Sequence, residues 1–361
     1  MLGEKVIFSS VVKGNAYGHG IATYCPIAYD CGVRHFSVAD AHEAASILDV
    51  LPYQDLTIMI MGMIENDELD WAISHHVEFY VFEKDRLLDA IEKARQLNIP
   101  AKIHLEVETG MNRTGFDIKT LSSIFELLKT HRQWIDVVGF CSHLAGAESI
   151  ANYKRIKDQQ KKFKKAISKL SSETEFTPVK HLASSAASIR YPKARYDMVR
   201  IGILQFGFFP TKEILVHFLN KDKSIVNPLH RIISWKTSVM VTKMIKEGQF
   251  VGYGTSYFTN HASKIAIIPV GYSSGYSRSL SNRGKVLIND KRFDIIGTVN
   301  MNMLAVDITT DTTIKKGDEV MLIGTQGAHE ISVSSFNDSI QMINYELLTR
   351  LPENLPRVIT Q

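Results

Sequence analysis

The feature that most constrains the fold is an alternation of short apolar runs with longer amphipathic stretches over the first two-thirds of the chain. Strands that alternate with helical patterns predict βαβ units and a parallel sheet. The apolar runs are Lys5–Val12, His35–Val38, Leu56–Met61, Val77–Val81, Ala101–Val107, Val137–Cys141 and His181–Ala183. The helical patterns are Ala41–Val50, Lys84–Leu97, Lys119–Thr130 and Asn152–Leu170. About seven or eight such units favour a closed α/β barrel of the (β/α)8 TIM-like class over an open sheet.

The pattern changes near Pro210–Lys212, and the remainder is rich in β-type segments separated by turn residues. A chain of 361 residues exceeds the size at which one hydrophobic core stops growing. We therefore expect a barrel at 1–212 and a mostly β C-terminal domain at 213–361. The expected β segments are Ile232–Lys246, Ala266–Tyr272, Lys285–Asp290, Phe293–Val299 and Glu319–Ile323, with tight turns at Asn289-Asp290 and at Lys316-Gly317-Asp318.

Charge and cysteine content exclude several classes of protein. The net charge of +4 is spread along the chain, and the denser run at Lys161–Lys169 is interpreted as a solvated helix face rather than a nucleic-acid surface. No apolar run approaches the roughly 20 residues of a membrane span, and no secretory signal is visible. Cys25, Cys31 and Cys141 have no metal-ligand spacing and are expected to be free thiols. We therefore expect a cytoplasmic protein without a metal, nucleic-acid or membrane site.

Lys13 is the first candidate catalytic residue. It stands where a β run ends, and Gly14, Gly18 and Gly20 follow within a few residues. Catalytic groups of a barrel lie at the carboxyl ends of its strands. A lysine that is partly desolvated there has a lowered pKa, which favours the neutral amine needed for a Schiff base. By spacing alone, the same residues also suit a surface lysine that begins a glycine-rich turn.

The run VVKGNAYGHG at 11–20 resembles the cofactor-lysine motif of alanine racemases. The resemblance continues, in order, over nearly the whole chain. The further segments are HLEVETGMNRTGF (104–116), CSHLAGAE (141–148), HLASSAASI (181–189), MVRIGILQFG (198–207), VGYGTSY (251–257), PVGYSSGYSR (269–278), GTVNMNMLAVD (297–307) and INYELLTRLPENLPR (343–357). It implies a fold-type III enzyme that uses pyridoxal 5'-phosphate to convert L-alanine to D-alanine, which supplies peptidoglycan.

The resemblance also assigns roles to residues. Lys13 holds the cofactor and acts as one acid/base, and Tyr272 is the second, on the opposite face of the substrate. Arg200 faces the pyridine nitrogen and donates a hydrogen bond without giving up its proton. The substrate carboxylate meets Arg113 and the backbone of Met301. The remaining implied cofactor contacts are His143 beside the ring, and Tyr17, Ser185, Gly202, Ile203 and Tyr345 around the phosphate.

Taken singly, several of these residues have ordinary structural explanations. Tyr272 suits a packed tyrosine at a strand end, Arg200 an ion pair at a barrel rim, and His143 a hydrogen-bonded structural histidine.

Three departures from the family pattern affect the expected site. Glu106 stands where the family commonly has a carbamylated lysine, and we predict that its carboxylate orients Arg113 in the same way, without bound CO2. Asn302 and Thr298 replace a usual aspartate and arginine, which alters the charge near the substrate. Family members also begin with a further strand and helix ahead of the cofactor strand. Their apparent absence would expose a sheet edge in the β domain.

The resemblance implies an obligate head-to-tail homodimer with composite sites. Lys13 and Arg200 would come from one chain, and Tyr272 and Met301 from the other. The implied substrate is alanine, because Tyr345 and Tyr257 favour a small side chain; serine comes next, and broad specificity stays open.

Three other classes of protein are alternatives to this interpretation. A decarboxylase of basic amino acids usually has a GxGGG loop and a cysteine in its β domain, and this chain has neither. A single-domain cofactor-binding protein would end near the barrel. A racemase that binds the cofactor but has impaired catalysis remains an alternative, although both acid/base residues are retained.

Overall fold

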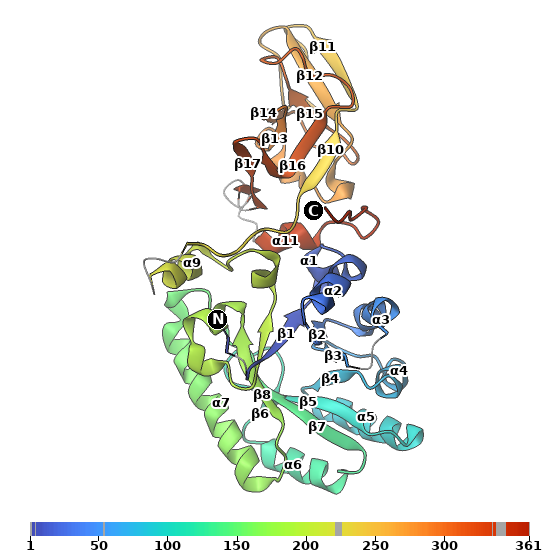
Figure 1. Ribbon diagram of the computed structural model, residues 1–361, viewed down its shortest axis with the longest axis vertical. Helices are drawn as coiled ribbons and strands as arrows, with labels where there is room; N and C mark the ends of the chain where they lie inside the picture. Colours follow the sequence, from blue (N-terminus) through green and yellow to red (C-terminus); the bar gives the residue numbers. More distant parts are fainter. Residues whose placement is uncertain are drawn as a thin grey trace. The chain divides into compact units, whose positions relative to one another are not determined.

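The computed structural model describes residues 2–3, 5–52, 55–220, 226–333, 335–336 and 344–360. Its contacts divide the chain into two compact units (Figure 1). The first unit comprises Met1–Ala16 and Gly20–Arg231, and the second comprises Tyr17–His19 and Ile232–Gln361. Ile343, which begins one of the family-like segments, lies outside the described residues. No helix in the described ranges is both long and apolar enough to cross a membrane.

The first unit is a closed barrel of parallel strands, as predicted. Neighbouring strands follow the order β4-β3-β2-β1-β9-β8-β7-β5, and a further pairing of β4 with β5 closes the ring. A short strand, β6 (Phe116–Asp117), pairs with β5 outside this ring. The barrel strands are β1 (Ile7–Val11), β2 (His35–Val38), β3 (Thr57–Ile60), β4 (Glu78–Val81), β5 (Ala101–Glu108), β7 (Ile135–Cys141), β8 (Val179–Ser184) and β9 (Met198–Ile201).

Helices follow most of the barrel strands, and local capping explains where some of them begin. The Asp40 side chain accepts a hydrogen bond from the backbone of Glu43 at the start of α3, and Glu83 caps α5 in the same way. The helices are α2 (Ile21–Asp30), α3 (Ala41–Val50), α4 (Leu69–Ser74), α5 (Lys84–Leu97), α6 (Leu121–Thr130), α7 (Tyr153–Glu173), α8 (Ser185–Arg190) and α9 (Lys212–Leu219). The helix α9 belongs to the first unit.

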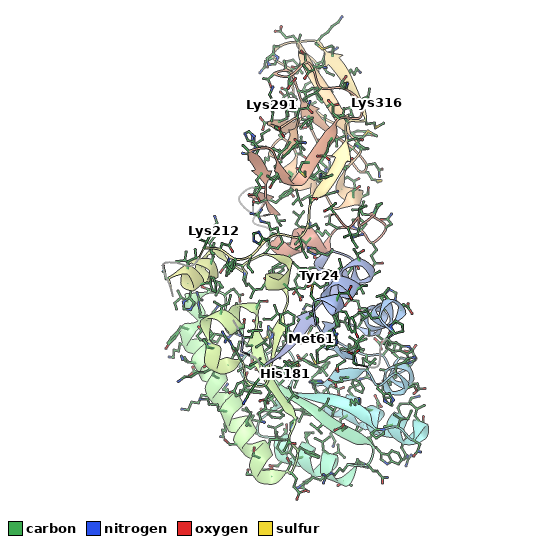
Figure 2. All side chains as sticks on the ribbon, in the orientation of Figure 1. Tyr24, Met61, His181, Lys212, Lys291 and Lys316 are labelled. Atoms are coloured by element: carbon green, nitrogen blue, oxygen red, sulfur yellow. The ribbon has the colours of Figure 1, made fainter. Side chains whose placement is uncertain are left out.

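The interior of the barrel is filled by side chains from several strands (Figure 2). Met59, Tyr80, Cys141 and Met198 form one buried cluster, against which Met61 packs. His181, also labelled in Figure 2, is fully buried. A packed interior of this kind leaves the chemistry to the strand ends.

The second unit is an antiparallel β domain. Its strands follow the order β10-β16-β13-β14-β15-β12-β11, and β17 pairs with β16. The predicted turn at Asn289-Asp290 is confirmed, since both residues have positive φ (48° and 59°) and Ile288 pairs with Lys291 across them. The elements are β10 (Trp235–Ser238), β11 (Val241–Ile245), β12 (Ser263–Ile268), β13 (Lys285–Ile288), β14 (Lys291–Ile296), β15 (Leu304–Asp307), β16 (Glu319–Gln326), β17 (His329–Ile331) and α11 (Asn344–Thr349).

Candidate active site

Strand β1 leads into a tight left-handed turn, labelled α1 (Lys13–Tyr17). The three residues that follow Lys13 have φ values of 65°, 52° and 53°, a conformation that L-residues rarely adopt in sequence. Glu43 on α3 stabilises the turn, because its carboxylate accepts a hydrogen bond from the backbone N–H of Asn15 at 3.0 Å. The turn fixes Lys13 at the carboxyl end of β1.

Lys13 lies in an electropositive environment. The residue is open to solvent, but protein atoms crowd its amino group. This desolvation lowers the pKa of Lys13 below its usual 10.5, and the positive charge of Arg113 lowers it further. Glu43 acts in the opposite direction, and Arg200 again lowers the pKa. The surroundings therefore favour the neutral, nucleophilic amine.

Arg200 on β9 is buried, with 5% of the residue exposed. One terminal nitrogen donates to Nδ1 of His181 at 2.5 Å, and the other donates to the carbonyl of Ser142 at 2.8 Å and to Nδ1 of His143 at 3.3 Å. A guanidinium group only donates hydrogen bonds, so both Nδ1 atoms accept. Burial and the charge of Arg200 lower the pKa of His143 to about 3. His143 is therefore neutral, with its proton on Nε2.

Glu106 on β5 is also buried, with 5% of the residue exposed. Burial raises the pKa of Glu106, whereas the Thr114 hydroxyl and the charges of Arg200 and Arg113 lower it. Within the described residues, no ion pair shorter than 4.0 Å joins Glu106 to Arg113. Glu106 thus attracts both arginines at longer range rather than by direct contact with Arg113.

Hydroxyl and backbone donors gather where β8 and β9 end. Ser185 begins α8, and Gly202 directly precedes a 3-10 turn, η3 (Ile203–Phe206). The N–H of Gly202 donates to the hydroxyl of Ser185 at 3.0 Å. Because β8 and β9 are neighbours in the barrel, the three residues Ser185, Gly202 and Ile203 come from adjacent strand ends.

Tyr17 and Tyr345 lie together in the second unit. Their rings meet edge to face, with centroids 6.1 Å apart. The intervening packing is tight, because a Cβ atom on Gly18 would lie 1.9 Å from the carbonyl oxygen of Leu348 in α11. Burial, with a contribution from Tyr345, raises the pKa of Tyr17 to about 12. Tyr17 therefore keeps its proton at neutral pH.

The structure brings Tyr272 and Met301 together in one exposed region of the β domain. The predicted strand at 266–272 lies too late in the sequence: β12 runs from Ser263 to Ile268, and Tyr272 begins a 3-10 turn, η4 (Tyr272–Ser274). The reason is the backbone of Met301, which approaches so closely that a Cβ on Gly271 would lie 2.3 Å from its oxygen. The Tyr272 and Met301 residues are 43% and 55% exposed.

Asn302 and Thr298, which also depart from the family pattern, have hydrogen-bond partners within the same domain. The amide of Asn302 donates to the hydroxyl of Ser273 at 2.8 Å, and Ser273 in turn donates to the carbonyl of Met301 at 2.7 Å. The hydroxyls of Thr298 and Ser256 lie 3.1 Å apart. Asn302 therefore helps to fix the loop that follows Tyr272.

The sequence assigned no role to Glu78, His104 and His181, which form a hydrogen-bonded row beside Arg200. A signal was present for His104, since strand periodicity places it on the same inward face as Glu106. No family-like segment pointed to Glu78.

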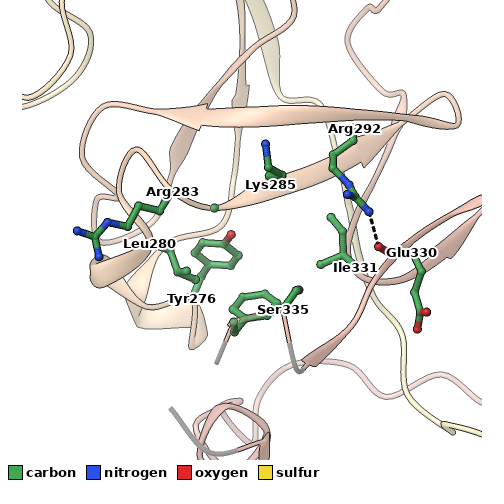
Figure 3. A pocket seen from close by; sticks show the side chains of 10 residues that line it. Tyr276, Leu280, Arg283, Lys285, Arg292, Glu330, Ile331 and Ser335 are labelled. Carbon is green, nitrogen blue, oxygen red and sulfur yellow. Dashed lines mark hydrogen bonds between the residues drawn. The ribbon is translucent and has the colours of Figure 1, made fainter. Parts of the chain in front are cut away.

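A cavity of about 220 Å³ lies in the β domain (Figure 3). Arg283, Lys285 and Arg292 are among its lining residues, but none of the predicted site residues is. Arg292 already donates to the carbonyl of Glu330, and Lys285 pairs with Asp294. We therefore place the chemistry at the strand ends of the barrel and not in this cavity.

The donor set suits pyridoxal phosphate. The first unit offers an amine for its aldehyde, a guanidinium donor for its ring nitrogen, and hydroxyl and backbone donors for its phosphate. Of the predicted residues, the first unit contains Lys13, Glu106, Arg113, His143, Ser185, Arg200, Gly202 and Ile203, and the second contains Tyr17, Tyr272, Met301 and Tyr345. In the described part of the chain, no three His, Cys, Asp or Glu side chains are grouped to hold a metal ion.

Comparison with known proteins gives one consistent result. Residues 2–210 match the family model of the alanine racemase N-terminal domain, and residues 232–359 match that of the alanine racemase C-terminal domain. The alanine racemase of Leptospira interrogans is 32% identical over 354 residues, which is 97% of this chain and 88% of the relative.

Solved structures of the same family match equally well. The Bacillus anthracis alanine racemase with bound L-Ala-P has a TM-score of 0.87 at 28% identity, covering 97% of this chain and 87% of that one. The Bartonella henselae alanine racemase with covalently bound pyridoxal phosphate has a TM-score of 0.80 at 25% identity, covering 97% and 91%.

Proposed function

Because the chain belongs to the alanine racemase family, we propose that it interconverts L- and D-alanine with pyridoxal 5'-phosphate attached to Lys13. The observation that carries the proposal is the environment of Lys13. Its amino group stands at the end of a barrel strand, with a pKa lowered by desolvation and by Arg113 and Arg200. Such an amine is suited both to covalent attachment and to proton transfer.

Several other residues would hold the cofactor. Arg200 would donate to the ring nitrogen, since its guanidinium is buried and keeps its proton. Ser185, with the backbone N–H groups of Gly202 and Ile203, would donate to the phosphate. Tyr17 and Tyr345 would add hydroxyl groups to the same phosphate. The covalently bound pyridoxal phosphate of the Bartonella henselae enzyme supports the identity of the cofactor.

When bound, pyridoxal phosphate serves as an electron sink that acidifies the α-hydrogen of an attached amino acid. The protein must then remove a proton from one face of the α-carbon and return one to the other face. Lys13 would serve one face. Tyr272 of the partner subunit would serve the other, which makes the active enzyme a homodimer with composite sites.

The substrate carboxylate would be bound by Arg113 and by the backbone of Met301 from the partner subunit. Glu106 would hold Arg113 in place by its negative charge. The L-Ala-P bound to the Bacillus anthracis relative supports alanine as the substrate. The D-alanine formed would serve peptidoglycan synthesis.

The test is a panel of L-amino acids incubated with the protein and pyridoxal phosphate, in which each D-isomer is measured. We expect D-alanine to form fastest, D-serine next, and neither to form with Lys13→Ala. Formation of another D-amino acid at a higher kcat/KM would overturn the substrate assignment. Cofactor binding without any D-isomer would overturn the proposed activity.

A further inference from the structure

A row of four polar side chains, of which Arg200, His181 and His104 are buried and Glu78 is half-buried, crosses the interior of the barrel. The guanidinium of Arg200 lies 2.5 Å from Nδ1 of His181, whose Nε2 lies 2.8 Å from Nδ1 of His104. Nε2 of His104 lies 2.7 Å from a carboxylate oxygen of Glu78. His181 and His104 are 0% and 1% exposed. The row joins residues of β9, β8, β5 and β4, four strands of one ring.

A glycine in the neighbouring strand leaves room for this row. Gly139 on β7 faces the ring of His104, and a Cβ atom at position 139 would lie 1.8 Å from Nδ1 of His104. Any side chain there would displace the imidazole from both of its partners. The absence of a side chain at 139 thus permits the hydrogen bonds of His104.

Only one arrangement of protons satisfies every bond in the row. Arg200 can only donate, so Nδ1 of His181 accepts and its proton is on Nε2. That proton is donated to Nδ1 of His104, which leaves the proton of His104 on Nε2, directed at Glu78. The tautomers of both histidines are therefore determined by the two charged ends.

The charges agree with this assignment. Burial and the charge of Arg200 hold the pKa of His181 well below its usual range, so His181 is neutral. Burial raises the pKa of Glu78, but the hydrogen bond from His104 and nearby charges outweigh it and lower the pKa overall. His35 lies 3.9 Å from Glu78, and burial lowers the pKa of His35 to about 4, so it adds no positive charge.

Two carboxylates can balance the charge of Arg200: Glu106 attracts it at longer range, and Glu78 ends the row that begins at its guanidinium. Within the described residues, no carboxylate lies within 4.0 Å of its guanidinium group. The carboxylate of Glu78 acts on it through two imidazoles whose dipoles are aligned. A buried charge needs such compensation, since desolvating a guanidinium alone is costly.

We propose that Glu78 and His104 are positioning residues, which hold Arg200 by fixing the proton of His181 on the nitrogen that faces away from the guanidinium. The consequence for catalysis rests on the proposed function, in which Arg200 meets the cofactor ring. Without the Glu78 carboxylate, His104 could carry its proton on either ring nitrogen. With its proton on Nδ1, His104 could no longer accept from His181, and the acceptor of Arg200 would be lost in turn.

The first test is nitrogen NMR of protein labelled with 15N-histidine, with and without pyridoxal phosphate. His104→Gln and His181→Gln identify the two sets of resonances. We expect both histidines to be neutral with the proton on Nε2 in each state. A proton on Nδ1 of His181, or a doubly protonated ring, would overturn the proposal without any variant at position 78.

The second test compares Glu78→Leu, which removes the acceptor, with Glu78→Gln, whose amide oxygen can still accept from His104. For Glu78→Leu we expect shifted His181 resonances and a loss in kcat of about tenfold, with little change in the KM for alanine. Glu78→Gln should restore the His181 resonances and most of the kcat. Glu213→Leu is the matched control, because Glu213 pairs with the buried side chain of Arg190 outside this row.

Unmoved His181 resonances in folded Glu78→Leu would overturn the coupling. The experiments distinguish a failure of the positioning role from a failure of the proposed racemase activity. If no amino acid is racemised but the tautomers are as stated, the positioning role stands without the proposed activity. If alanine is racemised but the tautomers differ, only the positioning role is lost.

Discussion

At the scale of single residues, the pKa of Lys13 determines when the cofactor can attach. Only the neutral amine attacks an aldehyde. Because desolvation, Arg113 and Arg200 lower this pKa, attachment should rise with pH and reach its midpoint below the 10.5 of an ordinary lysine. The measurement is the rate at which the absorbance of lysine-bound cofactor appears in cofactor-free protein across a pH series.

Two variants should move this midpoint in opposite directions. Arg113→Gln removes a positive charge and should raise the midpoint, whereas Glu43→Gln removes a negative charge and should lower it. Lys316→Gln, in a turn of the β domain, serves as the control and should leave it unchanged. Shifts of the same sign in the first two variants would contradict an electrostatic cause.

Replacing Glu106 with Gln should impair substrate binding without lowering the free energy of unfolding. Because burial raises the pKa of Glu106 overall, its ionised form is destabilising, and this cost is present at neutral pH and disappears on acidification. Glu106→Gln should therefore leave the free energy of unfolding at pH 7 unchanged or higher. Its KM for alanine should rise about tenfold, because Arg113 loses an opposing charge. Urea unfolding and steady-state kinetics measure the two effects, with Glu92→Gln on α5 as the control.

An unchanged KM would show that the charge of Glu106 does not orient Arg113. A lower free energy of unfolding would show that the carboxylate is structural instead.

The sequence could predict site residues that stand in distinctive local runs, but not those that depend on contacts between distant strands. Lys13 and Tyr272 stand in short runs rich in glycine, where the backbone conformation itself restricts the sequence. Glu78 stands in an ordinary apolar strand, and it reaches Arg200 only through two imidazoles from other strands. Contacts between distant segments of this kind leave no local pattern.

At the scale of elements, Gly18 lies close against the backbone of α11. Gly18 and Gly32 both have positive φ (78° and 95°), so alanine at either is strained. Only at Gly18 would the new Cβ meet backbone, 1.9 Å from the Leu348 oxygen; at Gly32 nothing lies within 4 Å. Gly18→Ala should lower the free energy of unfolding by about 3 kcal/mol or more, and Gly32→Ala by about 1 kcal/mol.

Thermal unfolding measures this difference, and the affinity for pyridoxal phosphate gives a second readout, because Tyr17 and Tyr345 flank the affected contact. Equal losses for the two variants would mean that backbone strain alone matters.

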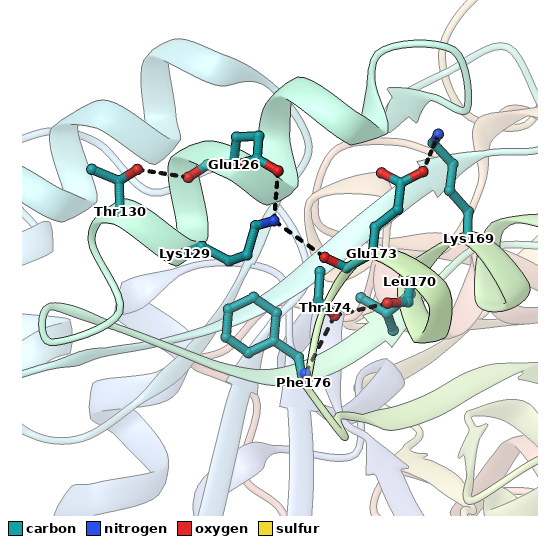
Figure 4. Close-up of polar contacts among 8 residues, drawn as sticks. All are labelled: Glu126, Lys129, Thr130, Lys169, Leu170, Glu173, Thr174 and Phe176. Atoms are coloured by element: carbon teal, nitrogen blue, oxygen red, sulfur yellow. Dashed lines mark hydrogen bonds and ion pairs between the residues drawn. The ribbon is translucent and has the colours of Figure 1, made fainter.

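The helix boundaries show which helix ends the hydrophobic periodicity of the sequence can predict. The helices at 41–50 and 84–97 begin and end as predicted. The helix predicted at 119–130 begins two residues later, at Leu121. The long helix α7 continues to Glu173 rather than ending at Leu170. Figure 4 shows why: Lys169 pairs with Glu173 at 2.6 Å, and Lys129 of α6 donates to the Glu173 carbonyl at 3.2 Å. The second contact comes from a different helix, so the pattern within α7 could not indicate it.

The basic run on α7 is a solvated face, as predicted. Lys161, Lys162, Lys164 and Lys165 are exposed, while Phe163 and Ala166 between them are buried.

At the scale of the whole molecule, the proposed composite site can be tested by mixing inactive chains. Tyr272→Phe and Lys13→Ala should each lower racemisation by about 10²-fold or more, because each removes one acid/base. In a mixed dimer, one site would combine an intact Lys13 with an intact Tyr272. Random pairing of the two variants should therefore restore about one quarter of the wild-type activity.

A mixture of Lys13→Ala with the double variant Lys13→Ala, Tyr272→Phe is the control, because it contains no intact pair. The readout is D-alanine formation after the chains are refolded together. Recovery in the control, or none in the test mixture, would refute a site shared between subunits.

The path of the chain at Tyr17–His19 affects whether the two units can be expressed as separate fragments. Tyr17–His19 belongs to the second unit, although the chain before and after it builds the barrel. The backbone oxygen of Gly18 accepts a hydrogen bond from Arg357, 3.0 Å away and near the other end of the sequence. If the chain were divided after Arg231, the barrel fragment would carry Tyr17–His19 without the residues that these three pack against. The β fragment would lack these three residues. Separately expressed halves should behave as a split protein, in which each half is soluble and ordered only when its counterpart is present.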